Sequence, residues 1–94
     1  MLNTELALDL VKVRLNRLRT DTNLDQYLRA RIDAVVEELG KTGIHLTESW
    51  DDLMLVVDMT VFQYQNRDQP GSMPEWLRLR RRERWLKEGG LRDS

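Results

Sequence analysis

Few residues of this chain have the type and spacing that chemistry at a site requires. The single histidine, His45, lies between two apolar residues, and the chain has no cysteine and no HExxH-like spacing. The segment GKTG, residues 40–43, contains Gly-Lys-Thr, but it lacks the upstream glycine of a phosphate-binding loop and follows an expected helix rather than a strand. We therefore expect no metal site and no cofactor.

Paired carboxylates, the other common catalytic arrangement, occur only as sequence neighbours. Glu37 and Glu38 are adjacent, as are Asp51 and Asp52. Adjacent residues on a helix point in different directions, which is poor geometry for shared acid and base work. The sequence predicts a protein that is not an enzyme.

Composition indicates one small domain. The chain has 94 residues, of which 40% are hydrophobic and 33% charged. We expect a single helical domain over 1–88 and a short flexible tail over 89–94. No apolar run reaches the roughly 18 residues of a membrane span, and the N-terminus does not resemble a signal peptide, so we expect synthesis in a cytoplasm and no membrane partner. Without disulfides, stability must come from packing or from association with further copies.

Apolar residues recur mostly at spacings of three and four, which predicts an all-α fold, a small bundle of about four helices with a basic C-terminal helix. A first helix is expected over about 4–18, with its core-facing side formed by Leu6, Leu10 and Val13, flanked by Ala7, Val11 and Leu18. A second helix follows the capping residues at 21–23 and ends at Gly40, with an apolar face of Leu24, Leu28, Ile32, Val35 and Leu39. Ile44 and Leu46 should hold the following connection against the core.

Ser49 and Asp52 have the spacing of a capping box and predict the start of a third helix, about 50–66. This helix is apolar nearly all the way round, so it is either the central element of the bundle or buried from a second side by a neighbouring subunit. Asp58 lies in its middle and would need a basic partner there.

The fourth expected helix begins at Pro74 and runs to about Lys87. Charge is concentrated around it: residues 1–66 hold 7 basic and 11 acidic side chains, whereas residues 67–94 hold 8 and 5. A projection at about 100° per residue predicts that one stripe docks on the core. That stripe consists of Trp76, Leu79 and Leu86, with Met73 and Pro74 ahead of it. The remaining surface is the predicted partner interface, formed by Leu77, Arg78, Arg80, Arg81, Arg82, Arg84 and Trp85.

This predicted interface has four possible explanations. The arginines could be a solvated surface paired to the acidic body, or an interface for protein, since Trp and Arg are enriched at binding hot spots. Nucleic-acid binding is less favoured because the sequence pI is about 5.8. Membrane binding is disfavoured because the bulky apolar residues fall on two sides of the helix.

Two long segments resemble the head-tail connector proteins of long-tailed bacteriophages and prophages, which are small helical head-completion adaptors that bind beneath the portal. The segments are LDQYLRARIDAVVEELGKTGIHL and DDLMLVVDMTVFQYQNRDQPGSMPEWLRLRRRERWL. The similar features are the Glu-Leu-Gly-x-x-Gly-Ile ending of the second helix, the aromatic segment 62–67, and Met73-Pro74 followed by Trp76-Leu77 and a basic helix. The resemblance covers roughly 6–86.

The resemblance implies a structural adaptor in the virion neck, made in the host cytoplasm. Its partners would be the portal protein, the next neck or tail-completion protein and further copies of itself in a ring, usually of twelve once docked, with DNA passing through the middle. It implies no catalytic residue. The density of arginines exceeds the family pattern, which leaves open contact with an acidic portal surface, a neighbouring copy or DNA. The alternative is a small nucleic-acid-binding or regulatory domain that uses the same helix.

Overall fold

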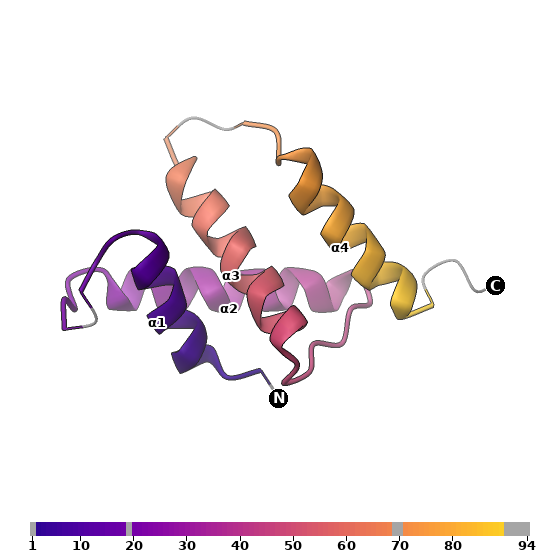
Figure 1. Cartoon of the computed structure of the whole chain (residues 1–94), viewed down its shortest axis with the longest axis horizontal. Helices are drawn as coiled ribbons and strands as arrows, with labels where there is room; N and C mark the ends of the chain where they lie inside the picture. The colour runs from indigo at the N-terminus through magenta and orange to yellow at the C-terminus, as the bar shows by residue number, and fades with distance from the viewer. Residues whose placement is uncertain (1, 19, 69–70, 90–94) are drawn as a thin grey trace.

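A computed structural model of the chain describes residues 2–18, 20–68 and 71–89. Over these ranges it consists of four α-helices joined by turns and loops, with no strand, which confirms the predicted all-α class. The helices are α1 (Thr4–Arg14), α2 (Asp25–Lys41), α3 (Trp50–Gln65) and α4 (Glu75–Lys87) (Figure 1). Of the predicted tail, only Gly89 lies within the described residues.

The first helix is shorter than predicted and buries a different face. Its N-terminus is capped by Asn3, whose Oδ1 accepts a hydrogen bond from the backbone N–H of Leu6 at 3.0 Å. It ends at Arg14, because Asn16 adopts a left-handed conformation with φ of 61°. Its buried apolar residues are Ala7, Leu8 and Val11. The predicted core residues Leu6, Val13 and Leu18 are exposed, because the register of the buried face is rotated toward Leu8.

The second helix buries the predicted apolar face, which consists of Leu28, Ile32, Val35 and Leu39, with Leu24 packed at its edge. It continues through Gly40 to Lys41, so the predicted stop was early by one residue. The chain turns at Gly43, which has a φ of 97°, and the N–H of Ile44 bonds to the carbonyl of Leu39 at 3.0 Å. Ile44 is then buried and Leu46 packs against the core, as predicted.

The third helix is the central element, and it contacts each of the other three helices. Its cap is the predicted Ser49, whose Oγ accepts from the N–H of Asp52 at 3.2 Å. The reciprocal half of a capping box is absent, because the Asp52 carboxylate instead accepts from the N–H and the hydroxyl of Thr47, at 2.8 and 2.9 Å. Burial extends over almost the whole segment 52–61. Burial within one chain therefore accounts for this apolar helix without a neighbouring subunit.

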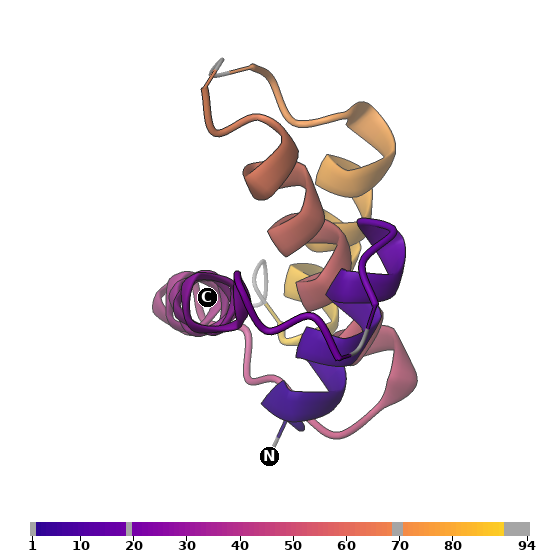
Figure 2. The same cartoon turned by 90° about the vertical axis from the view of Figure 1, so that its left-hand side faces the viewer.

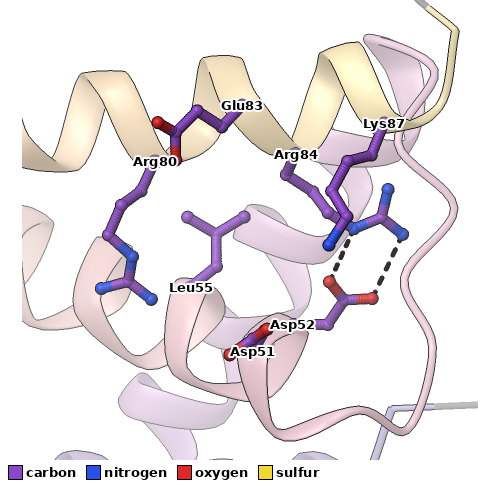
Figure 3. A pocket seen from close by; sticks show the side chains of 7 residues that line it. All are labelled: Asp51, Asp52, Leu55, Arg80, Glu83, Arg84 and Lys87. Carbon is purple, nitrogen blue, oxygen red and sulfur yellow. Dashed lines mark hydrogen bonds and ion pairs between the residues drawn. The ribbon is translucent and has the colours of Figure 1, made fainter.

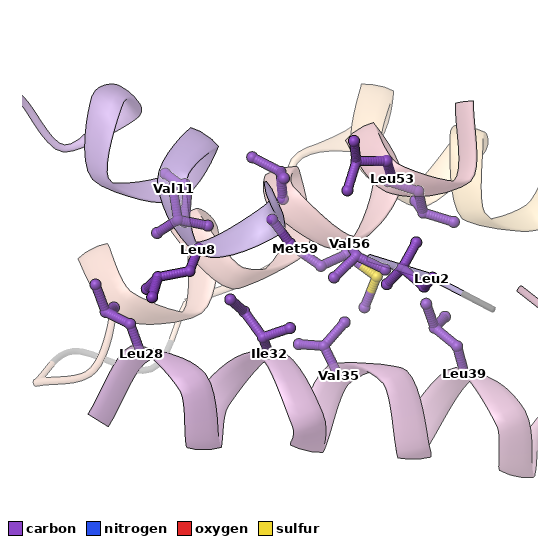
Figure 4. Packing of buried hydrophobic residues seen from close by; sticks show 14 of the residues in the cluster. Leu2, Leu8, Val11, Leu28, Ile32, Val35, Leu39, Leu53, Val56 and Met59 are labelled. Carbon is purple, nitrogen blue, oxygen red and sulfur yellow. The ribbon is translucent and has the colours of Figure 1, made fainter. Parts of the chain in front are cut away.

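The helices form two layers. Figure 2 looks almost along α2, which lies on one side, while α1, α3 and α4 lie on the other. Leucines, valines and Met59 from α1, α2 and α3 fill the space between the layers (Figure 4). At one edge, the Nζ of Lys12 lies 2.9 Å from the carboxylate of Asp25, which ties α1 to the start of α2. The fourth helix runs beside α3, and its backbone does not come close to that of α1 or α2 (Figure 1).

Candidate interaction surface of the C-terminal helix

The face of α4 that docks on the core is not the predicted one. Leu77, assigned to the partner interface, is 0% exposed and is the only buried residue of the helix. Trp85, also assigned to the interface, packs against the core and donates from its indole Nε1 to the carbonyl of Thr42 at 3.1 Å. The predicted docking residues Trp76, Leu79 and Leu86 are 50%, 48% and 38% exposed. Of that stripe, Met73 packs against the core and Pro74 is the helix cap.

Ion pairs to α3 explain this rotation. Arg84, 15% exposed, places Nε 2.6 Å from Asp52 Oδ1 and its NH2 group 3.2 Å from Oδ2 (Figure 3). Such a two-point contact fixes the orientation of the guanidinium. The same guanidinium also donates to the carbonyl of His45 at 2.7 Å and lies 3.1 Å from Glu88. Arg84 therefore holds α4 to both α3 and the loop before α3.

This contact sets the charge state of its members. Burial opposes ionisation of Asp52, but hydrogen bonds from Arg84 and Thr47 outweigh burial and hold the pKa of the Asp52 carboxyl below its usual range. The hydrogen bond to Asp52 raises the pKa of Arg84. The pKa of Glu88 is lowered, chiefly because it accepts the backbone N–H of His45 at 2.8 Å. Asp52 and Arg84 are thus both charged at neutral pH.

Asp58 supplies the second ion pair. The sequence predicted that this carboxylate needs a basic partner, and it has two, Arg14 from α1 and Arg80 from α4. Asp58 is 5% exposed, while both arginines are about two-fifths exposed, so the carboxylate is buried beneath two guanidinium groups that reach solvent. Through this residue α4 is connected electrostatically to α1, which it does not otherwise contact.

Two of the five arginines of the predicted interface are therefore committed to intramolecular contacts. The other three, Arg78, Arg81 and Arg82, form no ion pair with any residue in the described ranges. Because α4 presents Arg80 and Arg84 to α3, the three unpaired arginines lie along its remaining surface. Sequence spacing within α4 could not distinguish the paired arginines from the unpaired ones, because the distinction depends on where Asp52 and Asp58 lie on α3.

A groove lies beside these arginines, between α4 and the end of α2. It measures about 870 Å³ and is lined by Thr42, Ile44, Arg78, Leu79, Arg81, Arg82 and Trp85. Its apolar wall comes from Leu79 and Trp85, and its charge comes from the three unpaired arginines. On the next part of the helix surface, Trp76, Leu79 and Leu86 form an exposed apolar stripe.

Other chemistry is sparse in the described part of the chain. The His45 imidazole Nδ1 lies 3.7 Å from Glu88, but within 2–18, 20–68 and 71–89 no group of three or more His, Asp or Glu side chains is placed to hold a metal ion. Asp51 and Glu83 line a second hollow with Asp52 and Arg84, in which Asp52 and Arg84 are paired with each other across the two helices (Figure 3). None of the described helices is both long and apolar enough for a membrane span.

The chain was compared with protein-family models, curated proteins and solved structures, and none of them matches it.

Proposed function

We propose that this protein is a non-enzymatic structural adaptor of a phage or prophage neck. It would assemble as a ring under the portal, join head and tail, and let DNA pass. The observation that carries the proposal is the exposed stripe on α4. Its three large apolar side chains are between 38% and 50% exposed, although the opposite side of the helix is packed against the rest of the domain. Exposed apolar patches of this kind mark protein interfaces, and Trp is frequent at their centres. The resemblance in the order and spacing of sequence motifs supports the choice of the neck.

In this proposal the stripe contacts the portal protein. Trp76, Leu79 and Leu86 replace Leu77 and Trp85 as the apolar part of this interface, because Leu77 is buried and Trp85 packs partly against the core on the groove side of the helix. The ion pairs of Arg80 and Arg84 with the buried carboxylates Asp58 and Asp52 keep α4 in place while its outer side binds.

The test mixes the purified chain with the portal protein encoded in the same genome. The double variant Trp76→Ala/Leu79→Ala should keep its fold, because both side chains are half exposed. It should lower the affinity for the portal at least tenfold, measured by sedimentation velocity, since hot-spot truncations cost about 2 kcal/mol or more. The matched control is Trp50→Ala, a tryptophan 62% exposed at the start of α3. Equal binding by wild type and the double variant, or no binding by wild type, would contradict the proposal.

A second candidate, nucleic-acid binding, rests on the three unpaired arginines. If they contact phosphates, the chain should bind random duplex DNA with an affinity that falls steeply with salt. The double variant Arg78→Ala/Arg82→Ala should then reduce the slope of log K against log salt by about 2, because each phosphate contact contributes about 0.9. Fluorescence anisotropy between 50 and 200 mM salt, roughly the range in which such binding collapses, measures this slope. Failure to bind at the lowest salt would exclude this candidate.

A further inference from the structure

We propose that the groove beside α4 binds the outer face of α2 in a second copy of this chain. The inference deepens the proposed function, on which it rests for its biological role, by naming the partner of the groove. Trp76 and Leu86 of the apolar stripe are thereby left for the portal, and Leu79 lies at the border between the two surfaces.

The groove is complementary to a helix that carries carboxylates. Arg78, Arg81 and Arg82 line it, and no carboxylate of the described residues pairs with them. Clustered guanidinium groups on one flank of a helix repel each other, so an acidic occupant is favoured at this position. Leu79, which is 48% exposed, and the solvent-facing part of Trp85 lie between these charges and would contact the body of that helix.

The outer face of α2 has this chemistry. Ala30, Asp33, Ala34 and Glu37 are exposed, and their spacing of i, i+3, i+4 and i+7 puts them on one side of the helix. Leu28, Ile32, Val35 and Leu39 hold the opposite side against the core. Asp33 forms no ion pair with a described residue, and Glu37 has only Lys41 at 3.8 Å, with both side chains more than two-thirds exposed. An exposed pair of this kind holds its members weakly.

The alanines matter because they are small. Ala30 and Ala34 lie one turn apart beside the carboxylates, so a helix can approach the groove closely enough for Asp33 and Glu37 to reach arginine. A nucleic-acid backbone matches the arginines but offers nothing to the apolar residues beside them, and the chain as a whole carries a net charge of -1. These two points favour protein in this groove.

The two surfaces belong to different helices, so the contact is heterologous: each copy offers one α2 face and one groove. Repetition of such a contact builds a closed ring or an open filament, rather than a two-fold dimer.

Disulfide trapping tests this geometry, and the chain suits it because it has no cysteine of its own. The variants Ala34→Cys and Arg78→Cys both change exposed residues. Mixed at about 1 mM under mild oxidation and low salt, they should form a covalent heterodimer, because the proposed contact brings these positions together. Each variant alone should give much less dimer. A chain carrying both cysteines should give a ladder of multimers on a non-reducing gel.

The control pair is Val13→Cys with Arg78→Cys, since Val13 is exposed on α1, away from the proposed contact. Adding Asp33→Lys and Glu37→Lys to Ala34→Cys should reduce the heterodimer yield to the control level, while circular dichroism checks that the helices remain. Heterodimer yield no greater than that of the control pair would overturn the inference, as would strong dimer formation by Ala34→Cys alone. Binding of duplex DNA that requires Arg78 and Arg82 in the otherwise unchanged chain, together with a heterodimer yield no greater than that of the control pair, would assign the groove to nucleic acid instead.

This experiment uses no portal protein. If the cross-link fails to form but the portal protein still binds, only the proposed α2 contact is wrong. If the cross-link forms but portal binding does not depend on Trp76 and Leu79, only the proposed portal role of the stripe is wrong.

Discussion

Replacing Leu77 with alanine is expected to lower the free energy of unfolding by about 3 kcal/mol, because a fully buried leucine leaves both lost apolar contact and a cavity. The effect should be large for this domain since Leu77 is the one buried residue in the described part of α4. Urea unfolding followed by circular dichroism at 222 nm measures it. The predicted interface role of Leu77 would instead imply little change in the stability of the isolated domain.

The matched control is Leu79→Ala, the same substitution two residues away on the same helix. Leu79 is 48% exposed, so its replacement should change stability by no more than about 0.5 kcal/mol. Equal destabilisation by the two variants would show that α4 docks by a different face in solution.

Replacing Arg84 with methionine is expected to cost about 3 kcal/mol at pH 7, because it leaves the Asp52 carboxylate buried without its cationic partner. Methionine retains much of the volume and the flexible stem of arginine, so the loss is mainly electrostatic. The control is Arg82→Met, which removes an unpaired arginine from the same helix and should leave stability almost unchanged.

The pH dependence separates this charge effect from packing. The folded-state pKa of Asp52 lies below its ordinary value of 3.8, so its contribution is fully present above that value and is lost as the pH falls through the folded pKa. The difference in unfolding free energy between wild type and Arg84→Met should therefore shrink once the pH drops below about 4. Urea titrations at pH 7 and pH 3 give this difference directly. A difference that stays constant would mean that Arg84 stabilises α4 by packing alone.

The positions of the helices could be predicted because each buried face has a regular apolar spacing. In α2 the series from Leu28 to Leu39 defined the helix and its core side without reference to any other element. The cap at Ser49 and the need of Asp58 for a basic partner were also readable from local sequence and from the cost of burying a charge.

The orientation of α4 could not be predicted in this way. Its projection contains two apolar sets with arginines throughout, and each set could face the core. Burial of Leu77 is favoured by Asp52 and Asp58, which lie on α3 and attract Arg84 and Arg80. The positions of these two aspartates relative to α4 are a property of the tertiary structure, and a projection of α4 alone does not contain them. The register of α1 failed for a similar reason, because its exposed Leu6 and Val13 fit the helical spacing as well as Leu8 does.

The contacts of α3 have a consequence for the order in which the chain folds during synthesis. The helices α1, α2 and α3 contact one another pairwise, whereas α4 contacts only α3 among the helices. Most of their shared core can therefore form before α4 docks and adds Leu77 to it. The last helix would then dock onto a surface on which Asp52 and Asp58 are already in place, and we expect the attraction between these carboxylates and the basic helix to guide that step alongside the burial of Leu77.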